Sequence, residues 1–124
     1  MIYSERPVLL VNPPSDQPYS LSVQPPLGLL YIAAYLRKHG QAVAVLDLNV
    51  RNRWKMDLLL ELRRCDPAII GLTSNISNRL RTRQIASFVK EWKQSATVVA
   101  GGPHPTAAPE EYRSCSIDFV LPYE

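Results

Sequence analysis

The stretch Val8-Leu-Leu-Val-Asn-Pro-Pro14 decides the fold class of this chain. It opens with four apolar residues in a row and stops at Asn12 and two prolines. A short strand buried on both faces of a parallel sheet has this pattern, because neither face meets water. The next segment, Leu27–His39, is apolar almost all round, opens after Pro26 and is closed by Gly40. Proline before and glycine after a segment mark the ends of a helix, so we expect a buried core helix here.

The same alternation of apolar runs and helical segments continues to the end of the chain. The further predicted strands are Ala42–Leu48, Ala68–Leu72, Thr97–Ala100 and Ile117–Leu121. The further predicted helices are Met56–Cys65, Ser77–Ser95 and one that begins at Pro109, with Gly101–Pro105 as a loop. Right-handed helical crossovers between parallel strands build a doubly wound sheet. We therefore predict an α/β fold with five parallel strands in the order 2-1-3-4-5, flanked by helices and flavodoxin-like or Rossmann-like.

Length and composition fit one such domain. The chain has 124 residues, of which 46% are hydrophobic and 20% charged, and its net charge is +3. This charge is too small to indicate nucleic acid or a membrane surface as a partner. We expect a cytoplasmic protein, because we find neither a signal peptide nor a membrane-spanning run. Cys65 and Cys115 lack the spacing of a zinc or iron–sulfur site and are interpreted as reduced helix residues.

In an open parallel sheet, ligands bind beyond the carboxyl ends of the strands. The residues expected there are mostly neutral and either hydroxyl-bearing or stiff, as in Asn12–Ser15, Thr73–Ser77 and Gly101–Pro105. A receiver domain is excluded, because it needs acids after the first and third strands. A dinucleotide site is excluded too, because two prolines stand where it needs a glycine-rich turn. Asp47, which follows the second strand, is interpreted as a loop or helix-cap acid rather than a ribose ligand.

The hydroxyls and glycines at this edge predict a large, mostly uncharged ligand rich in amide and hydroxyl groups. Thr73 and Ser74 can donate and accept hydrogen bonds, and Gly101-Gly102 leaves room for close approach. Two local roles stay open beside ligand contact. One of Ser74 and Ser77 is equally suited to capping the third helix, and the glycine pair is suited to a tight turn.

These residues resemble the cobalamin (B12)-binding domain that precedes the radical S-adenosylmethionine (SAM) domain in B12-dependent radical SAM enzymes. The resemblance is carried, in this order, by Val8-Leu-Leu-Val-Asn-Pro-Pro14, Pro25-Pro-Leu-Gly-Leu29, Ile70-Gly-Leu-Thr-Ser74 and Val99-Ala-Gly-Gly-Pro-His-Pro105 with Pro109-Glu-Glu111. It implies a cobalamin whose nucleotide tail is swung away from cobalt and lies between sheet and helices, with the corrin over the strand ends. The residues it implies for this site are Pro13, Pro14, Leu27, Gly28, Thr73, Ser74, Asn75, Gly101, Gly102, Pro103 and His104.

The chain departs from B12 domains of this kind at two places. The methionine-synthase type carries Asp-x-His-x-x-Gly after the first strand, whereas Asn12-Pro-Pro-Ser-Asp-Gln17 has no histidine to bind cobalt. We expect His104 to form hydrogen bonds rather than to bind the metal. The family's fifth strand usually runs into Gly-Glu-Gly-Glu, whereas this sequence ends with Leu121-Pro-Tyr-Glu124. We expect residues 1–124 to form one cobalamin-binding domain with no catalytic residue and no metal ligand of its own.

The resemblance implies activity only together with a second domain. SAM and an iron–sulfur cluster would belong to a partner radical SAM domain, and the reaction would be methyl transfer through methylcobalamin or a radical rearrangement. Whether the chain is a fragment or a free-standing module stays open. The alternative is a cofactor-free interaction domain that kept the fold and docks a partner protein. Retention of hydroxocobalamin after desalting distinguishes the two.

Three arginines, Arg79, Arg81 and Arg83, crowd into the first turns of the third predicted helix. Helix N-termini favour acids, so we expect something to offset these cations. Arg79 is nearest to the strand end and to an anion beside the cleft. Arg81 and Arg83 are expected on the exposed face, where charge reversal would weaken docking of a radical SAM domain but leave cobalamin retention unchanged. The alternative is a basic surface answered by nearby acids or by nothing.

Overall fold

The computed structural model describes residues 6–16, 25–50, 53–113 and 116–122. In this part of the chain, five strands form one parallel sheet in the order β2-β1-β3-β4-β5, which confirms the predicted topology. The strands are β1 (Val8–Asn12), β2 (Val43–Asp47), β3 (Ile69–Thr73), β4 (Thr97–Gly101) and β5 (Phe119–Leu121).

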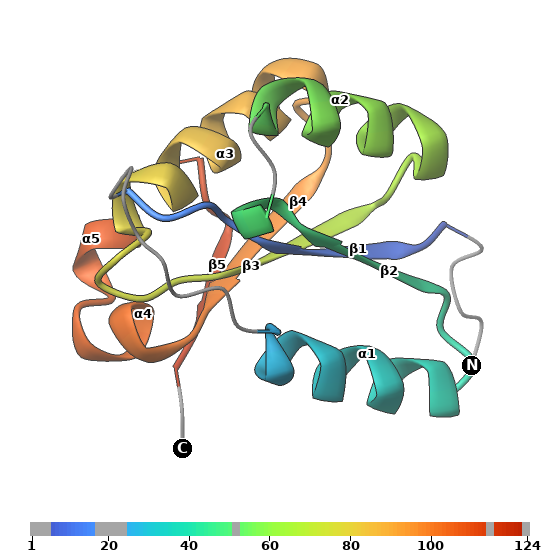
Figure 1. Cartoon of the computed structure of the whole chain (residues 1–124), viewed down its shortest axis with the longest axis horizontal. Helices are drawn as coiled ribbons and strands as arrows, with labels where there is room; N and C mark the ends of the chain where they lie inside the picture. Colours follow the sequence, from blue (N-terminus) through green and yellow to red (C-terminus); the bar gives the residue numbers. More distant parts are fainter. Residues whose placement is uncertain (1–5, 17–24, 51–52, 114–115, 123–124) are drawn as a thin grey trace.

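Helices cover the two faces of the sheet unequally (Figure 1). One face carries α1 (Leu27–Lys38), and the other carries α2 (Trp54–Cys65) and α3 (Arg79–Trp92). Three short helices complete the order: η1 (Leu48–Val50) follows β2, and α4 (Pro103–Ala107) and α5 (Glu110–Arg113) follow β4. The main core lies under α2 and α3 and contains Leu9, Val11, Leu58, Leu62, Ile70, Leu72, Ile85, Val89 and Val98. No helix in the described ranges is long and apolar enough to cross a membrane.

The predicted buried core helix is wrong for most of α1. Only Leu29 and Ala33 of this helix are buried, and they pack with Leu10 of β1 against the β1–β2 side of the sheet. Its exposed large apolar side chains are Leu27, Leu30, Tyr31, Ile32 and Tyr35. The helix is apolar all round but meets the sheet along one stripe. The same sheet face is therefore left open beyond β1, where Ile69 and Leu121 are exposed.

The predicted loop Gly101–Pro105 is wrong in its second half, because α4 begins at Pro103. Gly102 makes the turn into this helix with a φ of 112°. The backbone N–H of His104 then donates to the carbonyl oxygen of Ser74 at 3.2 Å, and that of Thr106 to Gly102 at 3.2 Å. Proline at the first position suits a helix, since the N–H it lacks would have no partner within the helix.

The third predicted helix is shorter than Ser77–Ser95 at both ends. Its start moves to Arg79 because the Asn75 side chain takes the backbone N–H of Ser77 at 2.8 Å, which favours a turn over a helix. Its end moves to Trp92 because Lys93 is extended. The prediction that Cys65 lies in a helix is confirmed, since it is the last residue of α2. Cys115 and the final pair 123–124 lie outside the described residues.

Candidate functional site

A polar pocket of about 310 Å³ lies at the carboxyl edge of the sheet, where β1 and β3 end. We call it the edge pocket. None of the described residues that line it is charged: they are Asn12, Pro13, Ser15, Pro25, Pro26, Gly28, Leu29, Asn49, Thr73, Asn75, Ser77 and Asn78. From β1 the chain adds β2 on one side, and from β3 onward it adds strands on the other side. Ligands of doubly wound folds bind at this switch point between β1 and β3. The lining of amides and hydroxyls suits a neutral ligand with many hydrogen-bonding groups.

An apolar groove of about 360 Å³ runs from the edge pocket along the open face of the sheet. We call it the face groove. It is lined by Val8, Leu10, Gly28, Leu29, Ile32, Leu36, Ile69, Gly71, Leu72, Thr73, Val99, Gly101, Gly102 and Leu121. Gly28, Leu29 and Thr73 line both spaces, so the two are continuous at the first turn of α1. The site therefore joins a polar end to an apolar end.

Glycines shape the face groove, and four of the chain's five line it. A Cβ atom on Gly28 would meet nothing within 4 Å, so only open space lies beside it. A Cβ atom on Gly71 would lie 2.8 Å from the Leu10 side chain, which lies across the floor of the groove. Gly102 is different, because its Cβ would lie 2.6 Å from the Ser74 carbonyl oxygen and its φ is positive. Gly102 thus serves the tight turn that the sequence left open.

Asp47 holds two residues of the edge pocket, Asn12 and Asn49, in place by hydrogen bonds. Its carboxylate accepts the side-chain N–H of Asn12 at 3.0 Å and the backbone N–H of Asn49 at 3.1 Å. Asn49 in turn accepts the backbone N–H of Ser15 at 3.1 Å. Asp47 is the last residue of β2, and its bond to the Asn49 N–H caps the start of η1, which agrees with the interpretation of Asp47 as a helix-cap acid.

The loop after β1 is also tied to α3. Asp16 accepts the backbone N–H groups of Leu80 at 3.1 Å and Arg81 at 2.9 Å, so its carboxylate caps the helix. The alternative that Ser74 or Ser77 caps this helix is wrong. Sequence alone did not connect Asp16 to a helix that begins more than sixty residues later, because a cap so distant in the chain leaves no local pattern.

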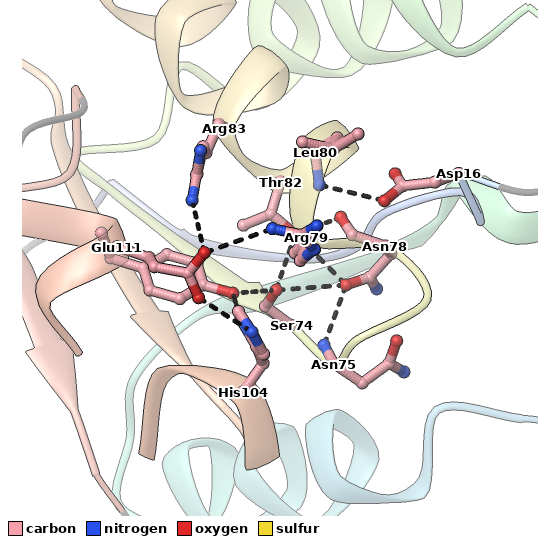
Figure 2. A network of polar contacts seen from close by, with 11 residues as sticks. Asp16, Ser74, Asn75, Asn78, Arg79, Leu80, Thr82, Arg83, His104 and Glu111 are labelled. Carbon is pink, nitrogen blue, oxygen red and sulfur yellow. Dashed lines mark hydrogen bonds and ion pairs between the residues drawn. The ribbon is translucent and has the colours of Figure 1, made fainter. Parts of the chain in front are cut away.

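Behind the strand ends, a buried chain of hydrogen bonds joins β3 to α4 and α5 (Figure 2). The hydroxyl oxygens of Ser74 and Tyr112 lie 2.7 Å apart, and the Tyr112 oxygen lies 2.6 Å from Nδ1 of His104. Nε2 of His104 lies 3.0 Å from Oε2 of Glu111. Tyr112 is fully buried, and this burial raises the pKa of its phenol above the usual value. The phenol therefore keeps its proton at neutral pH and can donate it.

Glu111 also forms ion pairs with two of the three arginines at the start of α3. Arg79 and Arg83 each place a guanidinium nitrogen 3.2 Å from its Oε1. This confirms for Arg79 and Arg83 the alternative in which nearby acids neutralise the basic surface. The anion that Arg79 contacts is a carboxylate of the protein itself. Arg81 instead donates to Gln84 at 2.8 Å and lies 6.0 Å from the centre of the Trp54 ring.

Of the eleven site residues that the resemblance implied, six line one of the two spaces and five line neither. Those that line the edge pocket or the face groove are Pro13, Gly28, Thr73, Asn75, Gly101 and Gly102. The five that line neither are Pro14, Leu27, Ser74, Pro103 and His104. Leu27 is 61% exposed, whereas Ser74 and His104 belong to the buried chain behind the pocket.

Sequence reasoning missed the floor of the face groove and Tyr112. The floor is one row across the sheet, in which Leu10 pairs with Gly71 and Gly71 with Val99. A glycine inside an otherwise apolar strand often marks a close approach, and the sequence offers this signal at Gly71. Tyr112 carried no such signal, because its partner Ser74 is distant in sequence.

The fold and this two-part site agree with one class of protein. Residues 20–124 match the B12 binding domain family, and the chain belongs to this family. A novel cobalamin-binding protein from Desulfitobacterium hafniense has the same fold, with a TM-score of 0.59 over 94% of this chain and 52% of that one, at 13% identity.

Two relatives are methyltransferases. The radical S-adenosylmethionine methyltransferase TsrM from Kitasatospora setae matches with a TM-score of 0.72 and 28% identity, over 84% of this chain and 20% of that one. An uncharacterized methyltransferase of Pyrococcus horikoshii is 33% identical over 119 residues, which are 92% of this chain and 26% of that protein. These findings confirm the resemblance inferred from the sequence. The chain spans about a quarter or less of the length of either methyltransferase.

Proposed function

We propose that this chain holds cobalamin with the corrin at the edge pocket and the nucleotide tail in the face groove. Membership of the B12 binding domain family supports the choice of ligand. The observation that carries the binding mode is the continuity of the two spaces at Gly28, Leu29 and Thr73. One ligand with a polar rim and a long tail can occupy both.

The residues present fit this cofactor. Corrin carries amide side chains, and the edge pocket offers neutral amides and hydroxyls as complementary donors and acceptors, among them Asn12, Asn49 and Asn75. The aromatic base of the tail is apolar, and the face groove is lined largely by aliphatic side chains and glycines. Both spaces have the size of ordinary small-molecule sites, which start at about 300 Å³.

His104 is assigned a hydrogen-bonding role rather than cobalt ligation. Both of its ring nitrogens already have protein partners, Tyr112 and Glu111. The loop after β1 offers no histidine either, so the tail is proposed to lie away from cobalt without a histidine from this loop replacing it. When bound, cobalamin supplies a cobalt centre for methyl transfer or radical chemistry. We assign that chemistry to a radical SAM domain that works with this one.

The test compares two ligands by visible absorption after desalting. Hydroxocobalamin is mixed with the protein at tens of micromolar, and cobinamide, which lacks the nucleotide tail, is tested in parallel. We expect the protein to retain cobalamin and to bind cobinamide at least tenfold more weakly, a difference of about 1.4 kcal/mol. Equal retention of both would exclude the tail from the face groove. Retention of neither would favour the cofactor-free interaction domain.

A further inference from the structure

We propose that Tyr112 is a positioning residue whose hydroxyl couples the protonation of His104 to the loop that forms one wall of the edge pocket. This loop, residues 73–78, contributes Thr73, Asn75, Ser77 and Asn78 to the pocket lining. The coupling is a property of the protein without ligand. Only its effect on cobalamin rests on the function proposed above.

The coupling path is a continuous chain of short contacts. From Nδ1 of His104 it passes through the Tyr112 hydroxyl at 2.6 Å and the Ser74 hydroxyl at 2.7 Å to Oδ1 of Asn78 at 3.2 Å. Tyr112 and Ser74 are almost completely buried, so water does not replace a missing partner between these two hydroxyls. Each hydroxyl has one proton to donate, and the donations along the chain must therefore run in one consistent direction.

With His104 neutral, the donations run toward the histidine. The Nε2–H group donates to Glu111, so Nδ1 is an acceptor and takes the proton of the Tyr112 hydroxyl. The Tyr112 oxygen then accepts from Ser74, whose single proton is thereby used. The hydroxyl of Ser74 has nothing left to donate to Asn78, whose Oδ1 keeps the backbone N–H of Asn75 and lies 3.4 Å from the Thr82 hydroxyl.

With His104 protonated, the donations run the other way. Both ring nitrogens are donors, so Nδ1–H donates to Tyr112, Tyr112 to Ser74, and Ser74 to Oδ1 of Asn78. That oxygen also accepts the backbone N–H of Asn75 at 2.9 Å. The protonated state therefore adds one buried hydrogen bond at the point where the loop is held.

The contacts of the His104 ring indicate that Nδ1 is the nitrogen that gains or loses the proton. The charged and titratable groups of the described chain in contact with its ring are Glu111 and Tyr112 of α5. Glu111 is shared with Arg79 and Arg83 of α3, while His104 itself belongs to α4. Nε2 keeps the same carboxylate in both states. Histidine side chains change charge between about pH 5 and 8, which sets the range of the experiment.

The first test uses NMR on the protein without ligand. We expect the backbone N–H signal of Asn75 and the side-chain amide of Asn78 to titrate together with the His104 ring. In Tyr112→Phe the ring still packs in the core, and the two loop signals no longer follow the protonation of His104. Tyr35→Phe is the matched control, because Tyr35 stacks on the other histidine, His39, at 4.4 Å and contacts no residue of this chain of hydrogen bonds.

The second test measures cobalamin affinity at pH 5.5 and pH 7.5. We expect wild type to bind more tightly at the lower pH, by up to about threefold, because a loop already held by the added hydrogen bond loses less freedom when the ligand binds, and Tyr112→Phe to show no such difference. Loop signals that titrate equally in Tyr112→Phe, or that stay fixed in wild type while His104 titrates, would overturn the coupling. Coupled loop signals in a wild-type protein that binds no cobalamin would support the coupling and overturn the proposed function instead.

Discussion

The carboxylate of Asp16 lies 2.9 Å from the backbone nitrogen of Arg81 and caps α3 from the loop that follows β1. Helix N-termini carry about half a positive charge, and the three arginines in the first turns of α3 add to it. Asp16 supplies a negative charge that offsets these cations, as the three arginines in the sequence led us to expect. Because Asp16 also donates its own backbone N–H to the carbonyl of Ser77 at 2.6 Å, the loop and the helix are held together at the edge pocket.

Removing this cap is expected to destabilise the fold. Asp16→Ala should lower the free energy of unfolding by about 1 kcal/mol, as the loss of other helix caps does. Asp16→Asn should cost less, because the amide oxygen still accepts a hydrogen bond. Ser77→Ala is the control, since the Ser77 hydroxyl does not cap α3. Denaturant melts measure all three, and an equal loss in Ser77→Ala and Asp16→Ala would refute the cap.

Blocking the junction between the two spaces should weaken cobalamin binding without harming the fold. A side chain at Gly28 meets open space, and replacing a helical glycine gains up to about 1 kcal/mol of stability. We therefore expect Gly28→Leu to melt at or above the wild-type temperature while its cobalamin affinity falls at least tenfold. Ala34→Leu, on the exposed side of the same helix, should bind normally. Wild-type affinity in Gly28→Leu would mean that the ligand does not cross this junction.

Asp118 makes stability depend on pH at the opposite side of the sheet. Burial acts to raise the pKa of its carboxyl, but hydrogen bonds from Lys90 at 2.7 Å and from the Val98 N–H at 2.8 Å leave it below the usual value. A carboxyl with a lowered pKa in the folded state stabilises the fold above its unfolded pKa, near 4. This stability is lost as pH falls through the folded pKa.

Asp118→Asn should therefore be less stable than wild type at pH 7, by about 1 kcal/mol once the partial exposure of the pair is allowed for. The difference should shrink steadily below pH 4. Urea melts at pH 7, 4 and 3 provide the measurement. A stability gap that stays constant over this range would show that the charge of Asp118 contributes nothing.

The sequence was most informative where structure depends on local pattern. The buried strands and their order followed from short apolar runs such as Val8–Val11, because a parallel sheet hides both faces of its strands. The position of the site followed from the same order, since Thr73 and Gly101 end strands that meet at one edge. Helix ends were less predictable: Asn75 and Asn78 use their side chains to hold a turn, which delays α3 by two residues.

Partnerships between distant residues could not be predicted in this way. The face groove exists because α1 covers only part of its sheet face, and no local pattern states how far a helix extends across a sheet. For this reason the apolar sequence of α1 predicts a buried helix, although Tyr31 and Tyr35 are exposed. The contact of Ser74 with Tyr112 likewise depends on α5 returning to the strand ends.

The outer surface between α2 and α3 leads to a last prediction about partners. Trp54, Lys55, Arg81 and Phe88 line a hollow of about 410 Å³ there, together with Arg83. Lys55 and Arg81 lie 5.7 and 6.0 Å from the Trp54 ring. Because Arg83 binds Glu111 and so supports the buried chain at His104, reversing its charge would disturb the fold behind the site as well as the surface. Arg81 is the better single probe of docking.

We expect Arg81→Glu to retain cobalamin as wild type does but to associate more weakly with the radical SAM domain that we propose as its partner. The loss should be largest at low salt, because ions screen exposed charges over about 10 Å at 0.1 M. Arg63→Glu makes the same charge change at an exposed position near the end of α2 and should associate normally. Titrations by calorimetry at 50 and 300 mM salt compare the three proteins. Equal affinities for all three at 50 mM salt would make Arg81 an ordinary surface cation, whereas an equal loss in Arg63→Glu would show that only net charge matters.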